Sequence, residues 1–211
     1  MSTFQPSELR GLRAWAGTDR LAALPELLPR PIVAERLLAV GRALWWLGDP
    51  DKAVDSVMQA VEADPKSVGI GPTAVAFLLE VGRPGEATDA FHRVLGEAEI
   101  GELYKVYMAL WLEGDAHRRG AAPDRIAHEY LASRHGDVWY ELLAEAATGR
   151  LDYAQLAAAA TTGPRKGELA FYTATLALAP GDPKKLLAQV VDAHLVMDAE
   201  YDLARVYLST K

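Results

Sequence analysis

A glycine turn recurs along this 211-residue chain at a nearly constant spacing, and this recurrence constrains the fold more than any other feature. The successive spacings are 82 − 48 = 34, 114 − 82 = 32, 149 − 114 = 35 and 181 − 149 = 32 residues. A period in the low thirties predicts an array of helical repeats. The glycines, each followed by Asp or Arg, are Gly48, Gly82, Gly114, Gly149 and Gly181.

Each turn is expected to end one helix and begin the next. Glycine readily adopts the left-handed backbone conformation that closes a helix C-terminus. Proline, which follows at three of the five turns, fits the first turn of a helix because its missing N–H has no partner there in any case. No segment shows the strict apolar–polar alternation of a β-strand. The sequence therefore predicts an all-α fold built from helix–turn–helix hairpins.

Residues 34–67 resemble one 34-residue unit of the tetratricopeptide repeat (TPR) family. In that family, small residues let the helices of one hairpin, and of the next, approach closely. The residues that match the family's characteristic positions in this unit are Gly41, Gly48, Ala53, Ala60 and Pro65.

The resemblance weakens toward the C-terminus. Residues 68–101 keep part of the register, and the chain after Gly114 carries about eight residues more than the family spacing. Residues 139–208 resemble the degenerate units of bacterial tetratricopeptide lipoproteins, although the chain has no cysteine for lipid attachment.

The resemblance implies a single TPR-like α-solenoid over residues 1–211, with about five to six hairpins. Its expected parts are a degenerate N-terminal hairpin at 1–33, the repeats at 34–195, and a C-terminal capping helix at 196–211 that covers the end of the array.

In the TPR family, the first helix of each hairpin lines a concave inner surface that binds partner peptides or helices. Counting from the glycines places an aromatic ladder on this surface, with Tyr104, Trp139 and Phe171 at equivalent positions. The alternative is that these rings fill space between neighbouring hairpins. The full set of predicted groove residues is Leu38, Arg42, Trp45, Tyr104, Lys105, Met108, Trp111, Trp139, Tyr140, Phe171 and Tyr172.

One specialised TPR groove holds the C-terminal carboxylate of a partner with cations and paired asparagines. This chain contains no asparagine, and its predicted groove offers only Arg42 and Lys105 as cations. The sequence therefore argues against a clamp of that kind.

A basic segment follows the third glycine in an otherwise acidic chain. His117, Arg118 and Arg119 lie within the predicted mobile loop 115–122. They form a candidate site for an acidic partner, and the alternative is a solvated loop tip.

The charge and composition exclude several classes of function. A formal net charge of −7 argues against nucleic-acid binding. The absence of cysteine excludes disulfides and thiolate chemistry. The first residues lack the apolar run of a secretory signal, and no apolar segment reaches the roughly 20 residues of a membrane span. A bacterial cytoplasmic protein is the expectation.

No catalytic or metal-binding pattern is found. The five histidines show no HExxH or comparable spacing, and no serine lies in a GxSxG turn. Residues 69–71, Gly-Ile-Gly, follow no strand and are interpreted as a hinge between helices. We therefore expect no cofactor, no metal and no catalytic residue.

The sequence thus favours a non-catalytic adaptor or scaffold that binds a partner peptide or helix in an aromatic-lined groove. One alternative is a small cytoplasmic secretion-type chaperone. A second is an enzyme or small-ligand sensor built on a helical array. The sequence makes no prediction of the partner's identity or of the oligomeric state.

Overall fold

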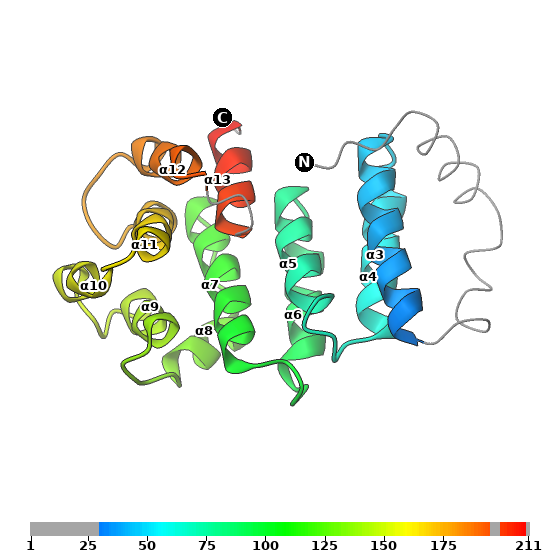
Figure 1. Ribbon diagram of the computed structural model, residues 1–211, viewed down its shortest axis with the longest axis horizontal. Helices are drawn as coiled ribbons and strands as arrows, with labels where there is room; N and C mark the ends of the chain where they lie inside the picture. Colours follow the sequence, from blue (N-terminus) through cyan, green and yellow to red (C-terminus); the bar gives the residue numbers. More distant parts are fainter. Residues whose placement is uncertain (1–29, 195–198, 210–211) are drawn as a thin grey trace. The chain divides into compact units, whose positions relative to one another are not determined.

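The computed structural model describes residues 30–194 and 199–209, and within them the chain is all-α, as predicted, with eleven helices and no strand (Figure 1). Most of the predicted N-terminal hairpin, residues 1–33, lies outside the described residues. The chain divides into two compact units, Met1–Ile100 and Gly101–Lys211, which are described separately below.

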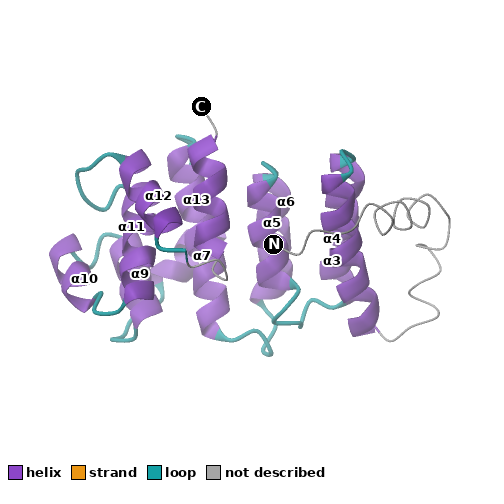
Figure 2. Cartoon of the chain, turned by 45° about the horizontal axis from the view of Figure 1, so that its top comes forward, coloured by secondary structure: helices purple, strands orange, loops and turns teal. Residues whose placement is uncertain are grey.

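The described part of unit 1 contains two antiparallel helical hairpins. The first pairs α3 (Arg30–Trp46) with α4 (Pro50–Ala63), and the second pairs α5 (Gly71–Glu80) with α6 (Pro84–Leu95) (Figure 2). The core includes a buried cluster inside the first hairpin, formed by Val40, Leu44 and Ala53, and the fully buried Phe91 of α6.

Both hairpin turns have the backbone geometry that the sequence predicts. Gly48 and Gly82 have φ of +79° and +73°. The N–H groups of Asp49 and Arg83 donate back to the carbonyls of Leu44 and Leu78, at 3.0 and 2.8 Å. These bonds satisfy carbonyls that the helix ends would otherwise leave unpaired.

A matched pair of alanine substitutions tests the role of φ at these turns. A Cβ at Gly48 or at Gly85 would meet no atom within 4 Å, but only Gly48 has a left-handed φ. We expect Gly48→Ala to lower the free energy of unfolding by about 1–2 kcal/mol. Gly85→Ala, within α6, should leave it unchanged or raise it by up to about 1 kcal/mol. Urea titrations measure both values, and equal effects would contradict the assignment of Gly48 as a helix-ending residue.

The first hairpin depends on small residues where its helices meet. A Cβ added to Gly41 of α3 would lie 2.6 Å from Val57 Cγ2 and 2.8 Å from the carbonyl oxygen of Ala53, both in α4. Ala53 and Ala60 are fully buried. The predicted close approach of the two helices at these small residues is confirmed.

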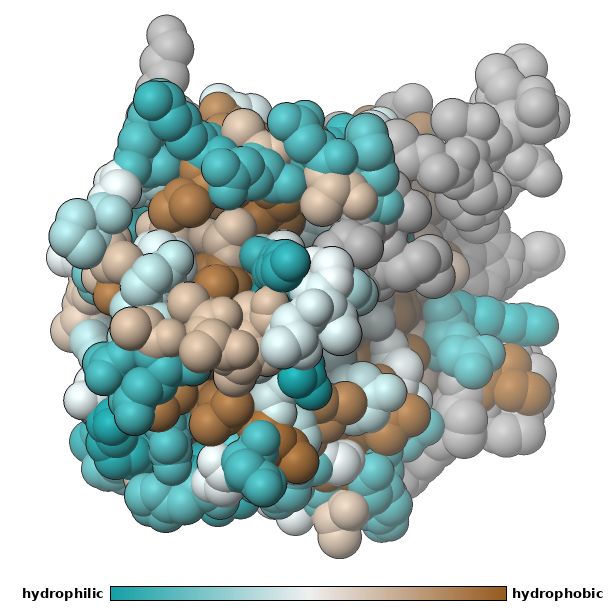
Figure 3. Space-filling view, turned by 60° about the vertical axis from the view of Figure 1, so that its left-hand side comes forward, coloured by the Kyte–Doolittle hydropathy of each residue, from teal (hydrophilic) through white to brown (hydrophobic). Residues whose placement is uncertain are grey.

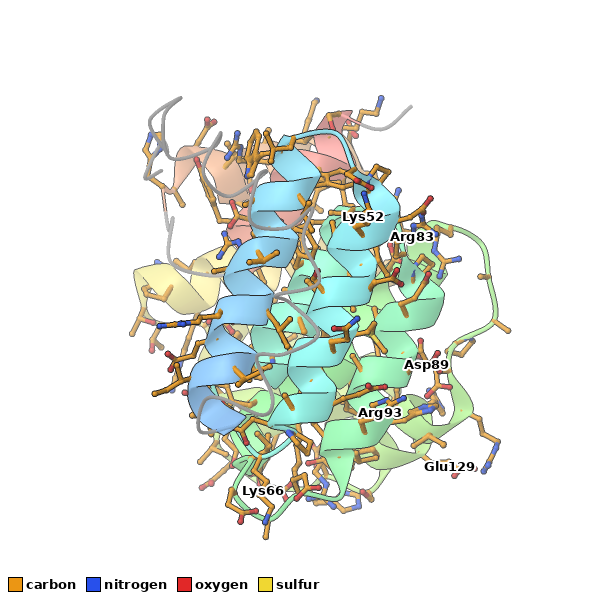
Figure 4. All side chains as sticks on the ribbon, turned by 90° about the vertical axis from the view of Figure 1, so that its right-hand side faces the viewer. Lys52, Lys66, Arg83, Asp89, Arg93 and Glu129 are labelled. Atoms are coloured by element: carbon orange, nitrogen blue, oxygen red, sulfur yellow. The ribbon has the colours of Figure 1, made fainter. Side chains whose placement is uncertain are left out.

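Three ion pairs lie along the face that carries α4 and α6 (Figure 4), two between the hairpins and one between the segments that follow α4 and α6. Arg83 pairs with Asp51, Arg93 Nη2 lies 3.0 Å from Glu62 Oε1, and Lys66 Nζ lies 3.1 Å from Glu99 Oε1. The labelled Arg83, Arg93 and Lys66 follow one another down this face. We call these contacts the α4–α6 ion pairs. Because they are solvent-exposed, they contribute more to register than to stability.

Unit 2 is organised around α7 (Glu102–Arg118). Apart from the half-buried Tyr107, every residue of α7 from Lys105 to Ala116 is buried. A helix buried on all sides is a central element rather than a surface one. The other helices of the unit are α8 (Arg125–Ala132), α9 (Trp139–Ala147), α10 (Tyr153–Ala159), α11 (Gly163–Leu176), α12 (Pro183–Asp192) and α13 (Ala199–Ser209). Of these, α8, α9 and α11 pack directly against α7.

Two of the predicted turns in unit 2 are wrong. Gly114 lies inside α7, where an added Cβ would be 2.9 Å from Thr175 Oγ1 of α11, so this glycine serves close packing. The helix instead ends near Gly120, which has φ of +64°. Gly181 does not end α11 either, because the left-handed residue there is Ala177, with φ of +50°. The predicted turn at Gly149, with φ of +73°, is confirmed.

Candidate functional site

Within the described part of unit 1, no helix covers one side of α3, and this side carries large apolar side chains. Trp46 is 70% exposed, Ile32 41% and Trp45 36%. Arg42 and Ala39 are also exposed. We define the α3 face as Ile32, Glu35, Leu38, Ala39, Arg42, Trp45 and Trp46.

The exposure of both tryptophans follows from the helix geometry. The opposite side of α3 is buried through Leu37, Val40 and Leu44. Adjacent residues on a helix diverge by about 100°, so a tryptophan pair that follows Leu44 turns away from this buried side. Trp45 rests edge-on against Phe77 of α5, with ring centroids 6.4 Å apart, while Trp46 points to solvent.

Three of the predicted groove residues lie on the α3 face, since Leu38 is half-buried and Arg42 and Trp45 are exposed. Trp46 and Ile32 were not among the predicted residues. Their signal in the sequence was a spacing of 14 residues, or nearly four helical turns, with the small apolar Ala39 midway between them.

In unit 2, the predicted aromatic ladder is largely internal. Tyr104 is 41% exposed and Tyr140 is half-buried, but the other six predicted residues are buried. The expectation that these six line an open groove is wrong, because α7, α9 and α11, which carry them, pack against one another within the unit. The six are Lys105, Met108, Trp111, Trp139, Phe171 and Tyr172.

Four of the rings in unit 2 donate hydrogen bonds to two carboxylates. Glu168 of α11 accepts from the Tyr107 hydroxyl at 2.5 Å and from Trp139 Nε1 at 2.8 Å. Glu200 of α13 accepts from Trp111 Nε1 at 2.8 Å and from the Tyr172 hydroxyl at 2.6 Å. Each carboxylate thus links its own helix to two other helices of the unit. Neither glutamate was predicted from the sequence.

These surroundings also change the pKa values of two buried tyrosines. Complete burial, reinforced by the Glu200 carboxylate, raises the pKa of Tyr172 well above its ordinary value. Burial, together with the charge of Asp115, raises the pKa of Tyr207 as well. Both phenols are therefore held neutral inside the folded unit.

The predicted basic loop is only partly a loop. Residues 115–118 belong to α7, and Asp115 is 4% exposed. Its carboxylate binds Arg119 Nε at 2.6 Å and Arg118 Nη2 at 3.3 Å, and the Arg118 guanidinium also stacks 4.1 Å from the centroid of the Tyr207 ring. His117 is exposed at the end of the helix. The prediction of a mobile loop from residue 115 is wrong for its first half, because these arginines are tied to the unit.

A second apolar area lies on unit 2. Figure 3 brings α9–α12 forward and shows small and apolar residues across the middle of that face, with hydrophilic residues around them. On α10, Tyr153 is 38% exposed, and Ala154 and Ala158 are exposed beside it. Alanine offers much less contact area than tryptophan, so this area is a weaker candidate than the α3 face.

Two of the described histidines lie beside single carboxylates. His128 Nδ1 lies 3.0 Å from Glu113 Oε1, and His135 Nδ1 lies 3.5 Å from Glu145 Oε1. Among the described residues, no group of three or more His, Asp or Glu side chains is placed to hold a metal ion. None of the helices in this part of the chain has the length and apolar character needed to cross a membrane.

No protein-family model matches the chain, and no match was found among curated proteins. The resemblance to the TPR family therefore remains a prediction based on the residues quoted above.

Proposed function

We propose that this protein is a non-catalytic protein-binding adaptor and that its partner-binding surface is the α3 face. The observation that carries the proposal is the exposure of Trp45 and Trp46 beside Arg42 on one helix. Tryptophan and arginine are among the residue types that contribute most to binding at protein interfaces. Exposed apolar patches on folded proteins commonly mark such interfaces.

The support beneath this face favours binding with little loss of entropy. The close contact of Gly41 with α4 and the fixed turn at Gly48 hold α3 in place. Trp45 is further oriented by its edge contact with Phe77. A surface that is already ordered before binding loses less conformational freedom when a partner docks.

Substitution of Trp46 tests this function. Because its side chain is mostly exposed, Trp46→Asp should keep the circular dichroism spectrum and shift the melting temperature by no more than a few degrees. It should weaken binding of the protein partner by about 2 kcal/mol or more. Quantitative affinity purification from the native cell measures the bound partner.

Tyr153→Asp on α10 is the matched control, since it introduces the same charge at an exposed aromatic residue of unit 2. It should retain the partner. If both variants retain the wild-type partners in full, the α3 face is not the binding surface.

A further inference from the structure

The α3 face is organised in three rows, each with a spacing of seven residues. Ile32, Ala39 and Trp46 form one apolar row, with its large side chains at the two ends and a small one at the centre. Leu38 and Trp45 form a second apolar row, and Glu35 and Arg42 form a charged row between the two. Seven residues advance a helix by only about 20° less than two full turns, so each row runs nearly straight along α3.

The two charges of the middle row have no partner within the described part of the chain. Glu35 and Arg42 are both exposed, and no ion pair or hydrogen bond joins either side chain to another described residue. Several other exposed charges of unit 1 are paired, as in the α4–α6 ion pairs. The α3 face thus presents one acid and one base, of opposite sign and two turns apart, between two apolar rows.

This arrangement is self-complementary. A two-fold axis perpendicular to α3, passing near residues 38 and 39, pairs positions whose numbers sum to 77 or 78. Glu35 then faces Arg42 of a second copy, and Arg42 faces Glu35 of that copy. If the two α3 helices were parallel, like charges of the two copies would face each other instead.

The size of the apolar side chains fits the same axis. Ala39 meets Ala39 of the second copy where the two helices cross, and its small side chain permits a close approach of their axes. Away from the crossing point, Trp46 of each copy meets Ile32 of the other. The large rings thus lie at the ends of the contact, where the two helices diverge and leave room for them.

We infer that the α3 face binds a second copy of this chain, with the two α3 helices antiparallel. The inference rests on the proposed function and names the partner of the same site. Every contact away from the axis occurs twice in such an interface. The Glu35–Arg42 contact therefore forms two ion pairs, and a substitution of either residue removes both. An interface centred on one helix from each copy is small, so the dimer should form reversibly with concentration.

Charge reversal provides the test, with self-association measured by sedimentation velocity at concentrations up to about 1 mM. Glu35→Arg and Arg42→Glu should each weaken the wild-type dimer by about tenfold or more, because each creates two like-charge contacts. The double variant Glu35→Arg/Arg42→Glu should recover dimerisation. An equimolar mixture of the two single variants should form a heterodimer more tightly than either variant forms a homodimer.

Asp55→Arg on α4 serves as the control, since it is an exposed charge reversal within unit 1 but away from the α3 face. It should dimerise like the wild-type chain. The inference is overturned if the wild-type chain stays monomeric, or if it dimerises and the charge reversals change nothing.

These outcomes are separable from a failure of the proposed function. A monomeric chain that binds a different protein through Trp46 would overturn the second copy as partner but leave the adaptor function standing. A monomeric chain whose partners do not depend on Trp46 would overturn both. A monomeric chain that Trp46→Asp strongly destabilises would also overturn both, because the α3 face would then be occupied by the chain itself.

Discussion

Truncating Trp111 to alanine is expected to lower the free energy of unfolding of unit 2 by about 3–5 kcal/mol. The ring is 7% exposed and lies in the centrally placed α7. Its removal leaves a cavity and takes from Glu200 one of its two aromatic hydrogen-bond donors. A buried carboxylate that loses a donor adds to the destabilisation. Urea denaturation followed by circular dichroism measures the change.

Two further variants separate packing from hydrogen bonding. Trp111→Phe keeps most of the apolar area but removes the N–H, so its effect should be about 1–3 kcal/mol. Trp46→Ala removes an equally large ring from an exposed position and should stay within about 0.5 kcal/mol of the wild-type chain. If Trp111→Ala is as stable as Trp46→Ala, then Trp111 is not a core residue.

Raising the pH above 10 is expected to unfold unit 2. Tyr172 and Tyr207 have pKa values raised by burial, whereas their unfolded-state value is 10.0. The folded unit therefore keeps protons that the unfolded chain releases. The stability due to these phenols is fully present below pH 10 and is lost as the pH rises above it. Each such tyrosine then contributes a loss of about 1.4 kcal/mol per pH unit.

Absorbance at 295 nm, which reports phenolate formation, measures this transition in unit 2 alone. All eight tyrosines of the chain lie in residues 101–211. The exposed tyrosines should ionise first, and Tyr172 only when helix content falls. Tyr172→Phe, which lacks the buried proton, should shift the unfolding to higher pH. Ionisation of all eight in one step with the helices intact would contradict the burial of Tyr172.

The all-α fold could be predicted because the signals for it are local. Gly48 and Gly82 end helices through a backbone conformation that glycine adopts without strain, and the proline that starts the next helix lies two residues later. No other residues are needed to predict where these helices end and begin. The small residues between α3 and α4 are likewise set by helices adjacent in the sequence.

The candidate site was harder to predict, because burial in unit 2 depends on distant residues. Gly114 followed by Asp115 resembles the other turns, and what makes it a packing residue is Thr175, 175 − 114 = 61 positions later. Trp111 finds its acceptor 89 positions away, in Glu200. The repeat register placed the aromatic ladder of unit 2 on an inner surface but did not show that the same unit covers it. Trp45 is exposed because, among the described residues, α3 packs on one side only.

The α4–α6 ion pairs also bear on how such a chain can grow by duplication. With the 34-residue register, a second copy of the first hairpin in place of the second would substitute Asp49 for Arg83, Gln59 for Arg93 and Pro65 for Glu99. Asp51 would then face another aspartate, and neither remaining pair would form. The two hairpins are therefore not interchangeable modules. Their charges favour this order along the chain, and a chain that repeats one hairpin loses these ion pairs unless the residues where it meets its neighbour also change.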